Sequence, residues 1–252
     1  MQATIDKRAV ARAFGRAASA YNQHAALQRA AGEKLMSLVT LPPAQRVLDA
    51  GCGTGWFSQR WQQQGHEVIA LDLSPGMLAQ AAGQQAASSY LAGDIEQLPL
   101  ADRCVDLTWS NLAMQWCSDL RRALDECRRV TRVGGKVLFS TLTADSLSEV
   151  HHAWQAVDAA PHANRFLTQA QIVALCTGLP LHWQHETLTL AFPGVLEAMR
   201  SLKGIGATHL PQGRTHTLLT RSRLQQLEAA WPQDSRGYLL TYHLFYGVID
   251  GD

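Results

Sequence analysis

Features that mark several protein classes are scarce or missing in this sequence. It has only five cysteines, an odd number with no C-x-x-C pair, so neither a disulfide framework nor a zinc site is expected. No apolar run reaches the roughly 18 residues of a membrane span. The net charge of +1 lacks the basic excess of a nucleic-acid-binding protein. We therefore predict a cytoplasmic protein that holds no metal and binds neither membrane nor nucleic acid.

The apolar content, in contrast, is sufficient for a full core. With 46% hydrophobic and 17% charged residues the chain does not have the composition of a disordered protein, and 252 residues suit one large α/β domain. The beginning of the sequence is rich in Arg and Ala, as in a transit peptide. The helical spacing of Val10, Phe14, Ala17 and Tyr21 favours the alternative, an amphipathic first helix.

Strands and helices alternate along most of the chain. A helical region is expected over about residues 6–39, with a break near Gly15 or Asn22. Seven strands are predicted, at "RVLDA", "HEVIALDLS", "SYLAGD", "CVDLTWSN", "KVLFSTL", "LHWQHETLTLAF" and "GYLLTYHLFYGVID". The connections among the first five are too short for anything except parallel βαβ units. We predict an α/β fold with a seven-stranded, doubly wound, mostly parallel sheet, helices on both faces and helical cap elements.

Polar residues follow the ends of four successive strands. Three glycines come directly after the first strand, where they allow a tight turn and the close approach of a ligand. Asp72 lies 21 residues after Gly51, near the spacing of a carboxylate that holds ribose hydroxyls. Asp94 and Asn111 follow the next two strands. Any one acid could equally be a helix cap or turn residue, but together they indicate a ligand site at one sheet edge.

The dinucleotide fingerprint G-x-G-x-x-G is incomplete, because Trp56 stands where its last glycine would be. The ordered motifs instead resemble those of class I S-adenosylmethionine-dependent methyltransferases, in "VLDAGCGTGWFS", "VIALDLSPGML", "AGDIEQLPL", "DLTWSNLAMQW" and "RRVTRVGGKVLFST". The resemblance implies a Rossmann-like methyltransferase fold that binds S-adenosylmethionine. It also implies one domain over 1–252, with a helical cap at 1–40, a cofactor-binding core at 44–143 and substrate-side helices and strands at 144–252.

The same resemblance implies a role for each matched residue. Asp49 and the glycine loop would contact the methionine part of the cofactor, and Asp72 would hold the ribose. Asp94 and Ile95 would flank the adenine, and Asn111 would lie near the sulfonium end. The cofactor-binding set is Asp49, Gly51, Gly53, Gly55, Asp72, Leu73, Met77, Asp94, Ile95 and Asn111.

The flanking segments narrow the resemblance to one family. The segments "AFGRAASAYNQHAALQRAAGEKLM", "NLAMQWCSDL", "PHANRFL", "AMRSLKGIGATH" and "LTYHLFYGVI" are similar to those of the malonyl-acyl carrier protein O-methyltransferases of the biotin pathway. That similarity implies methylation of the free carboxylate of a malonyl thioester on acyl carrier protein, with malonyl-coenzyme A as a further possible acceptor. A carboxylate has a pKa near ~4 and needs no base, which agrees with the lack of a nucleophile–base pair in the sequence.

A methyl acceptor that carries a carboxylate calls for a cation near the reaction. Arg200, at the border of an apolar helix stripe, is the predicted malonyl anchor, and Lys203, Arg165 and Arg16 are held in reserve. Basic residues at a helix end also suit the helix dipole, which is the alternative explanation for Arg200 and Lys203. Tyr21 and Trp116 are predicted to face the sulfonium, with ordinary core packing as the alternative. The role of His209 is left open.

Acyl carrier proteins are acidic, so docking requires a basic surface. Two patches are candidates: "RRALDECRR", with Arg121, Arg122, Arg128 and Arg129, and a second group of Arg214, Arg221 and Arg223. Two other functions stay open. One is methylation of a different small molecule, with His24 or His209 as a base, and the other is cofactor binding without catalysis.

Overall fold

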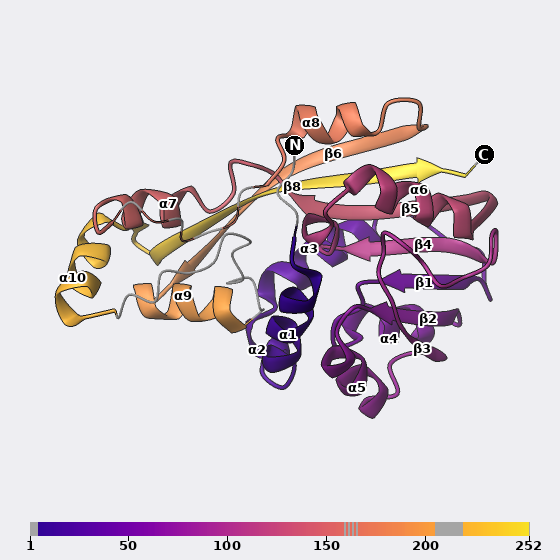
Figure 1. The fold of residues 1–252 in the computed structure, drawn as a ribbon, viewed down its shortest axis with the longest axis horizontal. Helices are drawn as coiled ribbons and strands as arrows, with labels where there is room; N and C mark the ends of the chain where they lie inside the picture. Colours follow the sequence, from indigo (N-terminus) through magenta and orange to yellow (C-terminus); the bar gives the residue numbers. More distant parts are fainter. Residues whose placement is uncertain are drawn as a thin grey trace.

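The computed structural model describes residues 5–158, 160, 162, 164, 166–204 and 219–251, and only the backbone of 203 and 204. A central sheet crosses the molecule in the strand order β3-β2-β1-β4-β5-β8-β6 (Figure 1). The long strands are β1 (Arg46–Ala50), β2 (Glu67–Asp72), β3 (Ser89–Ala92), β4 (Val105–Asn111), β5 (Thr131–Leu142), β6 (Leu181–Phe192) and β8 (Gly237–Asp250). All seven predicted strands are confirmed. The two-residue β7 (Gln233–Asp234), which pairs with β8, was not expected.

Among the seven long strands of the described residues, β8 alone runs in the opposite direction, and it pairs antiparallel with β5 and β6. The five strands from β3 to β5 are parallel, so their carboxyl ends meet at one edge of the sheet. The prediction of a doubly wound, mostly parallel sheet is therefore confirmed. Every polar residue that was predicted to follow a strand is placed at that edge, as the topology requires.

Helices cover both faces of the sheet because the strands bury alternate residues on opposite sides. In β1, Val47 belongs to the core beneath α3 (Ala26–Met36) and α4 (Trp56–Gln63). Its neighbour Leu48 belongs to the opposite core, beneath α6 (Leu120–Val130) and α8 (Gln169–Leu175). At the outer end of β6 and β8 lie α7 (Ser148–Gln155), α9 (Val195–Gly204) and α10 (Arg221–Ala230) (Figure 1).

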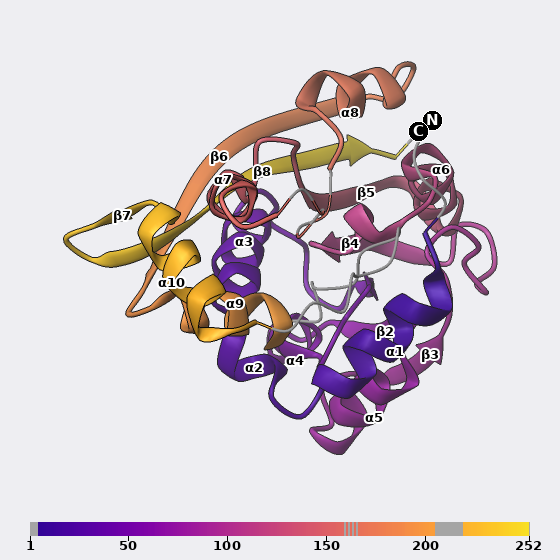
Figure 2. The same ribbon diagram turned by 60° about the vertical axis from the view of Figure 1, so that its left-hand side comes forward.

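The first helical region is divided differently from the prediction. Helix α1 (Lys7–Ala17) begins at the N-cap Asp6 and continues through Gly15, and the interruptions fall at 18–20 and 25, on either side of α2 (Tyr21–His24). Gly15 serves close packing instead of a break: a Cβ on Gly76 of α5 (Pro75–Gly83) would lie 2.9 Å from the Gly15 Cα. The two helices touch through their backbones, which places α1 across the front of the sheet edge (Figure 2).

Strand β5 begins five residues earlier than the predicted "KVLFSTL" and runs through Gly134 and Gly135. The strand passes β4 so closely there that a Cβ on Gly135 would lie 2.5 Å from the Asp106 carbonyl oxygen. The paired glycines therefore lie within β5, in the irregular stretch between its paired residues Thr131 and Lys136, and do not end the strand. Among the described residues, no helix is both long and apolar enough to cross a bilayer.

Candidate active site

A cleft of about 670 Å³ lies between α1 and the carboxyl edge of the sheet. Helix α1 supplies Lys7, Val10 and Phe14 to one wall, and the sheet edge supplies the other wall. Its lining contains most of the predicted cofactor-binding set, namely Gly51, Gly53, Asp72, Leu73, Asp94, Ile95 and Asn111. The structure thus brings together residues that are up to 60 positions apart in the sequence.

Asp72 fixes the shape of the glycine loop. Its carboxylate accepts a hydrogen bond from the Gly53 amide at 2.9 Å and another from the Ser74 amide at 2.7 Å. Burial raises the pKa of Asp72 to about 6, although these two amide donors favour the charged form. Gly51 has a φ of +84°, and a Cβ there would lie 2.4 Å from the Ala113 Cβ. Glycine is therefore required at this turn.

Asp49 stands behind the loop and is only 2% exposed. Its carboxylate accepts a hydrogen bond from the Ser58 hydroxyl at 2.6 Å. Burial raises the pKa of Asp49 to about 7 against the effect of that hydrogen bond, and the nearby Asp72 charge raises it further. Asp49 is buried and Asp72 is half-buried at the wall of the cleft, so two carboxylates share one small region, and neither forms an ion pair with a described cation.

A second cavity of about 440 Å³ opens beside Asp49 and shares Gly51, Gly53 and Asn111 with the cleft. Arg29 of α3 lines this cavity, lies 5.1 Å above the Trp56 ring and donates to the Asn22 carbonyl oxygen at 2.7 Å. Sequence reasoning missed Arg29, because a lone arginine in an amphipathic helix has no distinguishing pattern. Its proximity to the glycine loop is visible only in the folded chain.

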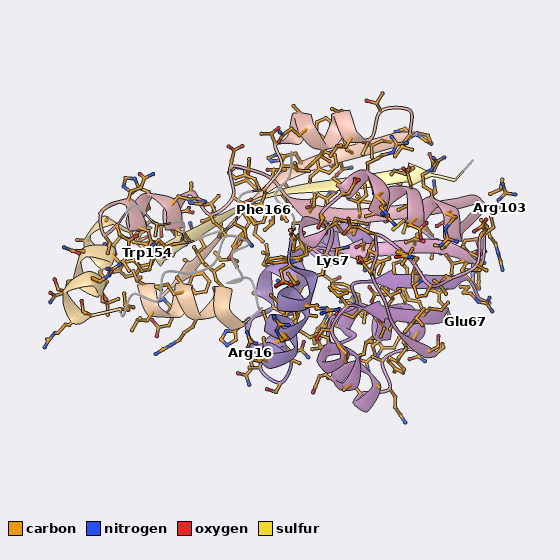
Figure 3. The ribbon with its side chains drawn as sticks, in the orientation of Figure 1. Lys7, Arg16, Glu67, Arg103, Trp154 and Phe166 are labelled. Atoms are coloured by element: carbon orange, nitrogen blue, oxygen red, sulfur yellow. The ribbon has the colours of Figure 1, made fainter. Side chains whose placement is uncertain are left out.

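Lys7 was also missed. Its ammonium pairs with both Asp94 and Glu96, and so ties the first turn of α1 to the loop after β3 (Figure 3). Asp94 also accepts a hydrogen bond from the Glu96 amide at 3.0 Å. The predicted adenine-side acid is therefore held from α1 as well as from its own loop.

A third cavity of about 480 Å³ lies on the other side of Tyr21. Its described lining is apolar or neutral and carries no charged side chain: Phe14, Tyr21, Leu27, Gln28, Leu112, Gln115, Trp116, Leu142, Leu147, Asn164, Phe166, Leu202 and Tyr242. The Phe14 ring meets Trp116 edge to face at 5.4 Å and lies 6.4 Å from Tyr21. Tyr21 lines all three cavities, so this one residue stands where they meet.

Three other predicted cofactor residues have structural contacts of their own. The Asn111 amide donates to the Gln28 carbonyl oxygen at 2.9 Å and accepts from the Ser140 hydroxyl at 2.8 Å, at the junction of the first two cavities. Gly55, with a φ of +83°, caps α4, and Met77 is fully buried in α5. Neither Gly55 nor Met77 lines a described cavity.

Arg200 and Arg16 are the two predicted anchoring cations whose side chains the structure describes, and neither lines a described cavity. The Arg200 side chain is 64% exposed and pairs with Glu197 at 2.9 Å, although Leu202 on the same helix lines the third cavity. Arg16 is exposed on α1. Arg165, the Lys203 side chain and His209 lie outside the described residues.

The site has the polar groups that S-adenosylmethionine would need. Ser74 Oγ in the cleft and Gln28 Oε1 in the second cavity are buried without a hydrogen-bond partner. Such groups are costly to leave unpaired, so they suit a polar ligand. The two buried carboxylates favour a ligand with hydroxyl groups and positive charge over one with a pyrophosphate.

The comparisons with known proteins agree with this geometry. Residues 48–139 match the family model described as "Methyltransferase domain". The malonyl-[acyl-carrier protein] O-methyltransferase of Erwinia billingiae is 59% identical over 98% of both chains. The enzyme of the same name from Salmonella typhimurium is 53% identical over 99% of this chain and 100% of its own.

Solved structures show the same fold at low sequence identity. The YcgJ protein from Bacillus subtilis is 18% identical, with a TM-score of 0.60, and the match covers 89% of this chain and 99% of that one. A geranyl diphosphate C-methyltransferase from Streptomyces coelicolor is 15% identical, with a TM-score of 0.54 over 90% of this chain and 80% of its own. The fold is therefore that of a Rossmann-like methyltransferase.

The buried charge of Asp49 gives a testable pH dependence. Because folding raises its pKa to about 7, Asp49 stabilises the ligand-free protein at low pH, and this contribution is lost as the pH rises from about 4 through 7. In Asp49→Asn we expect a flatter fall of Tm between pH 5 and pH 8. We also expect a higher Tm at pH 8, by about 2–4 °C for each kcal/mol by which the substitution raises the free energy of unfolding.

Asp125→Asn is the control, because this acid lies on the surface of α6 and pairs with Arg121. Thermal unfolding of the three proteins over the pH series measures the effect. An unchanged pH slope in Asp49→Asn would show that its carboxylate is not a source of strain in the ligand-free fold.

Proposed function

The chain belongs to the malonyl-[acyl-carrier protein] O-methyltransferase family, and on that premise we propose that it methylates the free carboxylate of a malonyl thioester on acyl carrier protein, with S-adenosylmethionine as methyl donor. The product is the malonyl-acyl carrier protein methyl ester. The role in biotin synthesis follows from the same family membership.

The observation that carries this proposal is the position of Tyr21 where three cavities meet. The first two, which share the glycine loop, form an elongated cofactor site. The third is an uncharged chamber that suits an acyl group. Its described lining comes from the cap (Phe14, Tyr21), the core (Trp116) and the substrate-side segment (Leu202), so the proposed three parts of one domain each contribute a wall.

The residues of the first two cavities would hold different parts of the cofactor. Asp72 accepts the ribose hydroxyls, Asp94 and Ile95 flank the adenine, and Leu73 packs beside them. In the second cavity, Asp49 lies near the ammonium of the methionine part, and Arg29 is the available partner for its carboxylate. The bound cofactor supplies the methyl group, whose S–CH₃ bond breaks as a malonyl oxygen forms the new O–CH₃ bond.

Two features of the chain favour that transfer. In the transfer, the malonyl carboxylate and the sulfonium lose their opposite charges. A chamber that stabilises these separate charges only weakly therefore lowers the barrier to methyl transfer. The described walls of the third cavity, which carry no charged side chain, provide such a chamber. No described histidine lines the three cavities, which suits an acceptor that is already ionised. Tyr21 and Trp116 present aromatic groups near the sulfonium, a contact worth about 0.5–2 kcal/mol.

Arg200 remains the proposed anchor of the malonyl carboxylate. It stands two residues before Leu202, a wall residue of the acyl chamber, and its long side chain has freedom to leave the exposed pair with Glu197. Lys203 and Arg165 are the reserve candidates. The proposed partner is malonyl-acyl carrier protein, with malonyl-coenzyme A as a further acceptor, and the proposed location is the cytoplasm.

The acceptor is tested by comparing malonyl- and acetyl-carrier protein with a radiolabelled methyl donor. We expect label in the malonyl form alone, because the acetyl form has no carboxylate. Alkaline hydrolysis should release the label as methanol, as it does from a methyl ester. Transfer to both forms, or to neither, would contradict the proposed acceptor.

The anchoring role is tested by comparing Arg200→Ala with Glu197→Ala. Both substitutions break the same surface ion pair, but only the first removes the guanidinium. We expect Arg200→Ala to lower kcat/KM for malonyl-carrier protein by about 10²-fold or more, while the affinity for S-adenosylhomocysteine stays within about twofold. Glu197→Ala should retain kcat/KM. Equal effects of the two variants would assign Arg200 to the surface ion pair alone.

A further inference from the structure

Helix α1 carries a row of arginines on the side turned away from the cleft. Arg8, Arg12 and Arg16 follow one another at intervals of four residues, so they align along one face of the helix. All three are exposed. In the described part of the chain, none of them has a hydrogen bond or an ion pair. We call these three residues the arginine face of α1.

This arrangement has no stabilising role within the chain itself. Like charges four residues apart lower the stability of a helix by about 0.2–0.5 kcal/mol for each pair. The sequence around the row does not compensate, because residues 7–32 contain five cations and no acid. The acids next to α1 act at its start, where Asp6 caps the helix and Asp94 and Glu96 pair with Lys7. Helix α5, against which α1 packs, has no charged residue either. A local positive field therefore extends from α1 for about 10 Å at 0.1 M salt, although the whole chain is nearly neutral.

Most of the described arginines in the two basic patches expected from the sequence are engaged in other contacts. On α6, Arg121 pairs with Asp125 and donates to the Thr177 carbonyl oxygen at 2.9 Å, and Arg129 pairs with Glu126 and Asp102. These contacts hold α6 to its neighbouring loops and leave little charge for a partner.

In the second patch, which consists of Arg214, Arg221 and Arg223, one arginine is engaged in the same way. Arg223 pairs with Asp158 and lies 5.8 Å above the Trp154 ring. Arg221 is exposed on α10, and Arg214 lies outside the described residues. Of these three basic groups, the arginine face of α1 therefore has the largest number of exposed side chains without a described partner.

We propose that the arginine face of α1 is the docking surface for the acidic acyl carrier protein, a proposal that rests on the proposed function. Charge complementarity identifies the partner, because a row of unpaired arginines fits an acidic helix. Position supports it as well. Phe14, two residues from both Arg12 and Arg16 and on the opposite side of α1, lines the acyl chamber. A carrier bound to the arginine face thus holds its flexible acyl arm beside that chamber.

The experiment uses the full chain with Arg8→Gln and Arg12→Gln combined, because glutamine removes the charge and keeps a good helix propensity. We expect KM for malonyl-carrier protein to rise about tenfold, kcat to stay near the wild-type value, and the affinity for labelled carrier protein to fall in parallel. The salt dependence of KM should weaken with it. Adding Arg16→Gln should increase the loss, and Arg8→Lys with Arg12→Lys should restore binding.

Arg103→Gln is the matched control, since this exposed arginine precedes β4 at the edge of the sheet remote from α1 (Figure 3). The affinity for S-adenosylhomocysteine confirms that each variant keeps its cofactor site. An unchanged KM in the double variant, with an active wild type, would overturn the docking surface and leave the proposed function intact. A wild type that does not methylate malonyl-carrier protein would overturn both.

Binding to anionic phospholipid vesicles tests whether the arginine face contacts a membrane instead of the carrier protein. If the wild type bound phosphatidylglycerol vesicles and the double variant did not, while carrier affinity was the same in both, the arginine face would be a membrane contact. That result would overturn carrier docking. We expect no vesicle binding that depends on Arg8 and Arg12.

Discussion

The burial of two carboxylates at one sheet edge is the constraint on which the rest of the site depends. Asp49 lies one residue before the end of β1, Asp72 ends the neighbouring β2, and desolvation raises the pKa of both. Hydrogen bonds from Ser58 and from the amides of Gly53 and Ser74 offset only part of the cost. A ligand with positive charge and hydroxyl groups completes this environment. Desolvation of these carboxylates therefore favours a ligand that is a nucleoside with positive charge.

Helix α1 links the cofactor-binding core to the acyl chamber and to the proposed docking surface. One face closes the cleft with Val10 and Phe14, the Lys7 ammonium holds the acids after β3, and the other face offers three unpaired arginines to solvent. Because Phe14 also lines the acyl chamber, cofactor enclosure, substrate access and carrier docking would be functions of one short helix. The close approach of Gly15 and Gly76 fixes where that helix lies.

Much of this could be predicted from the sequence where a local pattern determines the structure. The strand ends with Asp72, Asp94 and Asn111 indicated the sheet edge, because parallel topology brings such ends together. Arg29 and Lys7 could not be found in this way, since their contacts lie across long sequence separations. Met77 is fully buried in α5 and lines none of the described cavities, so its place beside the cofactor stays a prediction, because motif position does not determine side-chain direction. The three arginines of α1 are visible in the sequence, but their lack of acidic partners is a property of the fold.

We propose that cofactor and acceptor meet at Tyr21. A crystal structure with S-adenosylhomocysteine locates the sulfur atom directly. We expect adenine beside Ile95, the amino-acid part in the cavity between Asp49 and Arg29, and the sulfur atom facing Tyr21 at the mouth of the third cavity. A sulfur atom that faces away from Tyr21 and the third cavity would contradict it.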